Sequence, residues 1–334
     1  WLGTSLIPIA QVRARQQLEL AFGEFQSRLD VIGQIETTSR IITTYYFEWS
    51  CFEPLGRWIE ILEELLSARP DYPSPEIEFD AYSSMLLAAL YRRPGHPLLL
   101  ASVERVLFFL GTDIDLNRRV NGAIYLFSYA VLARDYSVGA RTLALVQPLL
   151  RHVELSPLNQ VWIHTRMGFY FCQVGRYEEA CDALTQAEAM VEHYGLKGLR
   201  SADRLIDSYW CTVLVGMRSS DLAKERYMRV VAFADPTRPM DRFHLHDPVC
   251  YLLSATGDLN QLEVHARAAI EAANAVGMPY IQAMSRVFLC EVLAETGRHE
   301  ELLAASAEAR QIVRGTCHEY YEVEFDLIEA FSYF

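Results

Sequence analysis

Apolar residues recur along most of this chain with the spacing of a buried helix face, and short turns interrupt them at regular intervals. The clearest example spans Met167 to Met190, where two apolar helical patterns flank the tight turn Gly175-Arg176-Tyr177. Residues three or four positions apart lie on the same face of an α-helix. This spacing is followed after the turn by Tyr177, Ala180, Cys181, Leu184 and Ala187. The segment therefore predicts a helix-turn-helix unit.

The same kind of turn recurs elsewhere between apolar helical patterns. Successive turns are separated by 37 to 45 residues, about 40 on average, and begin at residues 56, 95, 134, 175, 220, 257 and 297. A helix pair with one apolar stripe cannot bury that stripe alone, so stacked pairs share one continuous core. The regular spacing predicts an all-α repeat protein.

The segment from Met167 to Met190 resembles a tetratricopeptide repeat. Gly168 matches the small residue where the two helices cross, and Leu184 stands where a large apolar residue is usual. Ala180 and Ala187 match the small residues of the second helix. The chain departs from the pattern at His164, which replaces the usual Trp, and it lacks the closing Pro. The resemblance implies a right-handed superhelical solenoid of tetratricopeptide-like helix-turn-helix repeats, here with a period of about 40 residues.

Proline-rich connectors fall between the predicted repeats, at residues 69–75, 156–157, 235–239 and 277–279. We expect one repeat domain over residues 1–334. Within it, residues 1–41 form N-terminal capping helices, residues 42–314 form about seven repeats, and residues 315–334 form an incomplete last repeat. The chain begins at Trp1, which indicates a fragment of a longer protein.

Composition and charge indicate the class of protein, its partners and its cellular location. Hydrophobic residues make up 51% and charged residues 22% of the chain, which is globular rather than disordered composition. The net charge of −13 repels nucleic acid, so we expect no direct nucleic-acid binding by this segment. No apolar run approaches the ~18 residues of a membrane span, and we expect no membrane contact. The seven Cys form no framework typical of secreted proteins, which indicates reduced thiols and a cytoplasmic location.

The repeat spacing and the segment SARPDYPSPEIEFDAYSSMLLAALYRRPGHP, residues 67–97, resemble the helical-repeat region of large bacterial transcriptional regulators. These are the maltose-activator-like and antibiotic-regulatory-protein-like families. Their phosphate-binding signature G-x-x-x-x-G-K-[ST] is absent from this sequence, so only their repeat region is represented. The resemblance implies a signal-sensing module that binds an inducer or partner and passes its state to a switch module.

A tetratricopeptide-like solenoid lines its concave groove with the first helix of each pair. We therefore expect the partner, a protein, a peptide or a small-molecule inducer, to bind there. Tyr and Trp combine large contact area with a polar group, and Arg can pair with an acidic group. Mapping from each turn places in the groove Tyr46, Tyr82, Arg92, Arg93, Asn121, Trp162, Phe169, Trp210, His244, Asp247 and Tyr251.

Other groups of polar residues give weaker indications of a metal site or a catalytic site. His246 and Cys250 share a helix face while His244 lies to the side, which leaves a zinc site incomplete. Pro248 marks a predicted helix start with Asp247 as its N-cap. The adjacent residues Cys317-His318-Glu319 supply no convergent nucleophile and base. We expect no metal, no other cofactor and no enzymatic activity. The competing function is a generic scaffold that assembles an effector enzyme with its partners.

Overall fold

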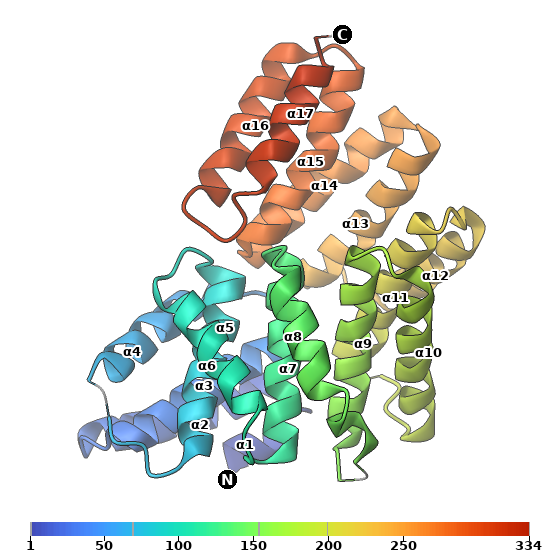
Figure 1. Cartoon of the computed structure of the whole chain (residues 1–334). Coiled ribbons are helices and arrows are strands. Elements are labelled where there is room, and N and C mark those ends of the chain that lie inside the picture. The colour runs from blue at the N-terminus through green and yellow to red at the C-terminus, as the bar shows by residue number, and fades with distance from the viewer. Residues whose placement is uncertain (1, 69, 153, 199, 334) are drawn as a thin grey trace.

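The chain folds entirely into helices within the part that the computed structural model describes, residues 2–68, 70–152, 154–198 and 200–333. An N-terminal cap consists of α1 (Leu2–Leu6) and α2 (Gln11–Ser27). Pairs of helices then follow one another, and α17 (Tyr321–Phe331) comes after the last pair (Figure 1). The predicted all-α repeat architecture is confirmed.

The successive pairs consist of a first helix, an inter-helix turn and a second helix. They are α3 (Val31–Glu48) with α4 (Leu55–Ser67), α5 (Pro75–Arg92) with α6 (Leu98–Leu110), α7 (Leu116–Leu132) with α8 (Tyr136–Val146), α9 (Pro157–Gln173) with α10 (Tyr177–His193), α11 (Arg200–Gly216) with α12 (Ser220–Phe233), α13 (Pro239–Thr256) with α14 (Leu259–Val276), and α15 (Pro279–Glu295) with α16 (His299–Val313). A short 3₁₀ helix (Leu149–Arg151) follows α8.

The residues at which helices begin account for the proline-rich connectors. They also show that one expected boundary is wrong. Pro75, Pro157, Pro239 and Pro279 are the first residues of their helices, where proline loses no hydrogen bond. The expected boundary between residues 41 and 42 is wrong because it falls inside α3. That helix begins at Val31, where the carboxylate of Asp30 accepts a hydrogen bond from the Gly33 amide at 2.9 Å.

Five of the seven predicted turns coincide with inter-helix turns, and two are displaced. Gly56 lies in the first turn of α4, and Ser220 is the first residue of α12. The chain reverses earlier because Trp49 (φ 47°) and Arg218 (φ 59°) adopt the left-handed conformation near the helix ends. Glycine usually occupies that conformation, so neither Trp49 nor Arg218 signals a turn in the sequence, and the predicted turns were placed at the following Gly56 and Ser220.

Adjacent helices approach each other closely where a glycine, which has no Cβ atom, lies at the crossing point. A Cβ atom added to Gly168 on α9 would lie 2.8 Å from Cγ of Leu184 on α10. Gly139 on α8 allows a similar close approach, because a Cβ atom added to it would lie 2.2 Å from Cε2 of Tyr170. The role expected for Gly168 from the repeat pattern is therefore observed, and the close approach buries the apolar faces in one core.

The superhelix returns on itself, so that the C-terminal pairs touch the turns of the N-terminal pairs. In Figure 1, α14 to α17 lie above α5 to α8. The Phe52 amide donates to the Val276 carbonyl at 2.8 Å, and the Cys317 amide donates to the Pro94 carbonyl at 3.1 Å. Arg134 forms an ion pair with Glu324 across 190 residues of sequence. We call these contacts, together with those of His318, the closure contacts.

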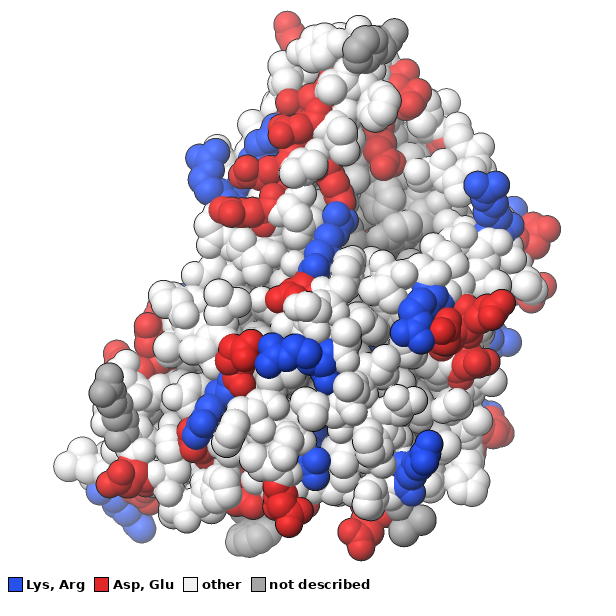
Figure 2. Space-filling view, in the orientation of Figure 1, with Lys and Arg blue, Asp and Glu red and all other residues white. Residues whose placement is uncertain are grey.

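Among the described residues, no helix is both long enough and apolar enough to cross a lipid bilayer. The face drawn in Figure 2 carries interspersed basic and acidic side chains and is hollowed below the C-terminal helices. All seven cysteines are free thiols, and Cys172, Cys211, Cys250 and Cys290 are buried, as the apolar helical context predicted.

Candidate functional site

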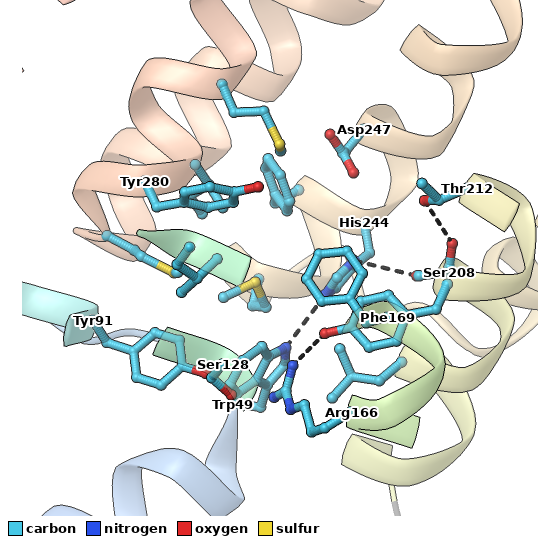
Figure 3. A pocket seen from close by; sticks show the side chains of 18 of the residues that line it. Trp49, Tyr91, Ser128, Arg166, Phe169, Ser208, Thr212, His244, Asp247 and Tyr280 are labelled. Carbon is cyan, nitrogen blue, oxygen red and sulfur yellow. Dashed lines mark hydrogen bonds between the residues drawn. The ribbon is translucent and has the colours of Figure 1, made fainter. Parts of the chain in front are cut away.

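The first helices of the array surround a partly open cavity, which we call the central cavity. The volume open to the centre of a water molecule is ≈ 80 Å³. Each first helix of the described pairs, or the residue that ends it, contributes to the wall. The lining residues include Trp49 after α3, Tyr91 of α5, Leu132 of α7, Arg166 and Phe169 of α9, Ser208, Tyr209 and Thr212 of α11, His244, Asp247 and Tyr251 of α13, and Tyr280 and Met284 of α15 (Figure 3). A ligand in this cavity would therefore contact the whole repeat array.

A chain of hydrogen bonds joins three elements across the cavity wall. The indole Nε1 of Trp49 donates to Nε2 of His244 at 3.3 Å. Because Nε2 accepts, the proton of the neutral imidazole resides on Nδ1, which lies 3.3 Å from the Ser208 hydroxyl oxygen and donates to it. Residue 49 and residue 244 are thereby held together although 195 positions separate them. The contact fixes both ring orientations at the cavity (Figure 3).

Arg166 places a buried positive charge in the wall. Its side chain donates to the hydroxyls of Tyr46 at 3.1 Å and of Tyr209, and its Cζ lies 5.3 Å from the Trp49 ring centroid. Among the described residues, no carboxylate forms an ion pair with Arg166, and its Nε has no hydrogen-bond partner. The residue is 3% exposed. Phenol oxygens and ring faces stabilise this cation, but no opposite charge neutralises it.

Asp247 places a carboxyl group in the same wall without a partner. Its Oδ1 has no accessible surface and no hydrogen-bond partner among the described residues, and no basic side chain forms an ion pair with it. Burial raises the pKa of Asp247 to about 7, because a low-dielectric surrounding disfavours the ionised form. A carboxyl group that changes charge near neutral pH is typical of functional sites.

Asp247 lies inside α13, so the predicted helix start at Pro248 and the predicted N-cap role of Asp247 are wrong. The helix begins at Pro239 and runs through Pro248 to Thr256. A proline within a helix removes one amide donor and disturbs the preceding turn. The hydroxyl of Tyr227 on α12 donates to the Leu245 carbonyl in that turn at 2.9 Å.

Four of the eleven residues expected in the groove line this cavity, namely Phe169, His244, Asp247 and Tyr251. Tyr46 lies directly behind the wall as the hydrogen-bond partner of Arg166. The structure places Asn121 elsewhere, at a separate hollow of ≈ 70 Å³ beside Asp80 and Arg118. Tyr82 is half-buried against the apolar core.

The two tryptophans and the two arginines do not line the cavity. Trp162 is 4% exposed and packs on Tyr46, with ring centroids 4.9 Å apart. Trp210 packs toward α12, where Cζ of Arg226 lies 4.7 Å from its ring. Arg92 pairs with Glu53 at 2.6 Å, and Arg93 with Glu60 at 2.5 Å. These arginines carry carboxylate partners near the inter-helix turns.

The expected groove residues that do not line this cavity differ from the lining residues mainly in helix register. Adjacent helix residues point about 100° apart, so a shift of one position exchanges inward and sideways residues. On α11 the inward ring belongs to Tyr209 rather than Trp210. Arg166 was missed, although it is the only ionised side chain within the apolar stretch 161–172. A single charge in such a stretch is the signal that could have identified it.

The other polar clusters separate in the structure. His246 faces His265, with Nδ1 atoms 3.1 Å apart, while His244 faces Trp49. Among the described residues no group of three or more His, Cys, Asp or Glu side chains is placed to hold a metal ion. Burial raises the pKa of Cys317 to about 12, so its thiolate is strongly disfavoured at neutral pH.

No protein-family model matches this chain, and no curated protein matches it significantly. Among solved structures, the crystal structure of a Rap protein complexed with Competence and Sporulation Factor has a similar fold. The TM-score is 0.63 at 10% sequence identity, over 88% of this chain and 81% of the Rap chain. At this identity the likeness shows a shared helical-repeat fold and nothing more.

Proposed function

We propose that this chain is the signal-sensing and interaction module of a bacterial transcriptional regulator, and that its central cavity binds an inducer or part of a partner. The observation that carries the proposal is the cavity wall, to which every described helix pair contributes. The Rap protein of similar fold, solved with Competence and Sporulation Factor, supports ligand binding as a use of this architecture. The resemblance of residues 67–97 to the regulator families supports the wider role.

Ligand binding in this cavity would be coupled to the state of the superhelix. The wall joins residues from both ends of the array, as in the contact of Trp49 with His244. A ligand that contacts both ends stabilises the closed form, and it shifts the equilibrium by its preference for that form. The proposed readout is therefore closure of the array, transmitted to an attached module. In this proposal the module acts in the cytoplasm, performs no catalysis, and binds neither nucleic acid nor membrane.

The test is a thermal-shift screen of the chain against peptides, amino acids, sugars and nucleotides. A ligand that binds only the folded state raises the melting temperature, by the equivalent of ~2.7 kcal/mol at a concentration one hundred times Kd. The variant Thr212→Phe, which places a ring in the cavity, is expected to abolish the shift. A shift that survives in this variant, with circular dichroism showing a native fold, would contradict binding in the cavity.

A specific observation also favours the scaffold function. On α17, Val323, Leu327 and Phe331 are 60%, 54% and 75% exposed and follow each other at helical spacing. An exposed apolar stripe of this kind is typical of a partner-binding surface. Leu327→Glu is expected to abolish binding of a protein partner at this stripe, measured by co-purification with a defined partner. Asp247→Asn is the control, since the scaffold function does not use the cavity.

A further inference from the structure

Two charges of opposite sign face the cavity and do not neutralise each other. Arg166 comes from α9 and Asp247 from α13, and neither has an ion-pair partner among the described residues. Figure 3 shows them at opposite ends of the cavity, with His244 between them. Burial accounts for the raised pKa of Asp247, without a lowering contribution from Arg166. The two charges therefore act as separate sites.

The phenol rings of Tyr209, Tyr251 and Tyr280 line the same cavity as Asp247. Burial first, and then the negative charge of Asp247, raise the pKa of Tyr251. The same carboxylate contributes to the raised pKa of Tyr280 and of Tyr209, again after burial. An ionised carboxyl group among aromatic rings attracts an organic cation through its charge and through the ring faces. An ammonium group also supplies the hydrogen-bond donors that Asp247 lacks.

The Arg166 end presents the opposite chemistry. The guanidinium is held by the hydroxyls of Tyr46 and Tyr209, while its Nε has no partner among the described residues. A planar guanidinium binds carboxylates through paired hydrogen bonds. Because Arg166 cannot lose its proton at neutral pH, an anionic ligand group is the simplest way to neutralise it.

We infer that the cavity binds a small zwitterion, with its ammonium group at Asp247 and its carboxylate at Arg166. This inference rests on the proposed ligand-binding function and names the class of ligand. The open volume of ≈ 80 Å³ has room for roughly six water molecules, at ~10–15 Å³ for each. A slender chain with charges at both ends, such as an ω-amino acid or a dipeptide of small residues, suits this volume and the placement of the two groups at opposite ends of the cavity.

The experiment is isothermal titration calorimetry of the whole chain at pH 8, where Asp247 is mostly ionised. The ligands are 6-aminohexanoate and diglycine, compared with hexylamine and hexanoate as single-charge analogues, and glycine as a short zwitterion. We expect the long zwitterions to bind at least tenfold more tightly than either single-charge analogue and than glycine. Because these comparisons use the unaltered chain, the Arg166 end is tested without a variant that could fail to fold.

The variant Asp247→Asn is expected to reduce the affinity for 6-aminohexanoate to that for hexanoate. The matched control is Asp221→Asn, which removes a carboxylate whose side chain is 99% exposed outside the cavity and keeps the preference for the zwitterion. Equal affinities for 6-aminohexanoate and hexylamine, or tightest binding by glycine, would overturn the two-ended arrangement. Cavity binding of an uncharged sugar, unaffected by Asp247→Asn, would overturn the ligand class while the proposed function stands. If none of these compounds binds, the zwitterion inference fails, and the thermal-shift screen still decides the proposed function. If Thr212→Phe leaves all binding intact, both proposals fail.

Discussion

At the residue scale, Arg166 and Asp247 are two ionisable side chains that line one cavity without an ion-pair partner among the described residues. A buried charge without a counter-ion costs free energy that a hydrophobic residue at the same position would not. Arg166 lowers part of this cost through phenol hydroxyls and ring faces, and Asp247 lowers it by binding a proton more readily. Both groups are therefore expected to reduce the stability of the protein, and the proposed ligand would offset that cost.

Asp247 is expected to make stability fall as the pH rises. Its pKa is about 7 in the folded chain and about 4 in an unfolded one, so the native state holds more protons between these values. The unfolding free energy then decreases across this window, by ~4 kcal/mol in total. Asp247→Asn removes the effect. Between pH 5 and pH 8 we therefore expect the melting temperature of the variant to rise relative to that of the wild type. The control is Asp221→Asn, because the Asp221 side chain is 99% exposed. The melting temperature of this variant should depend on pH as that of the wild type does. If the melting temperature of Asp247→Asn also does so, the assignment is wrong.

His318 is expected to act in the opposite direction. Its Nδ1 donates to the Leu132 carbonyl at 2.9 Å, its Nε2 has no partner among the described residues, and burial lowers its pKa to about 4. The unfolded chain, with a pKa near 6.5, binds more protons between these values. The wild type should therefore lose ~2 kcal/mol between pH 7 and pH 5 relative to His318→Asn, measured by urea unfolding. His193→Asn, at an exposed position, is the control. If the wild type and His318→Asn lose the same unfolding free energy between pH 7 and pH 5, the His318 imidazole is not held neutral.

At the element scale, the helix pairs depend on a left-handed residue in the inter-helix turn and on close crossing. Gly175, Gly257 and Gly297 supply positive φ in three turns, whereas Trp49, Arg134 and Arg218 supply it in three others. Non-glycine residues in this conformation are strained. Two of these residues also make long-range contacts, Trp49 with His244 and Arg134 with Glu324.

The crossing of α9 and α10 should not tolerate a methyl group at Gly168. The added Cβ would lie 2.8 Å from Cγ of Leu184, which is fully buried, so Gly168→Ala should destabilise the chain by ~1–3 kcal/mol. Gly23 on α2 is the matched control, because a Cβ there meets no atom within 4 Å. Gly23→Ala should stabilise by about 0.4–1 kcal/mol. Equal denaturation midpoints for the two variants would contradict the packing described for this pair.

At the scale of the whole molecule, the closure contacts distinguish this array from an open solenoid. In an open solenoid each repeat contacts only its neighbours, and stability is nearly a sum over neighbouring units. Here His318 and Tyr320 both contact the Leu132 carbonyl at 2.9 Å, across more than 180 residues. Such contacts couple the first three pairs to the last two, so we expect the array to unfold as one cooperative unit.

The variant Gly95→Ala should open the array. Its Cβ would lie 2.3 Å from the Gly315 carbonyl oxygen, a backbone atom that cannot move aside without separating the two turns. We expect a larger radius of gyration in small-angle X-ray scattering and weaker binding of any cavity ligand. Gly56→Ala is the control, because its Cβ would meet only the Arg93 side chain at 3.6 Å. Identical scattering from both variants would show that the closure contacts do not hold the array together.

The sequence by itself determined the local architecture. Helix periodicity, the spacing of about 40 residues and the prolines that begin four first helices depend on neighbouring residues, and all are visible along the chain. Only the tertiary structure decided which face of each helix points inward, because a rotation of about 100° separates Tyr209 from Trp210. It also decided that the array closes, since superhelix curvature accumulates from small rotations between repeats. The opposed charges of Arg166 and Asp247 share one cavity only because this curvature brings α9 and α13 around the same axis.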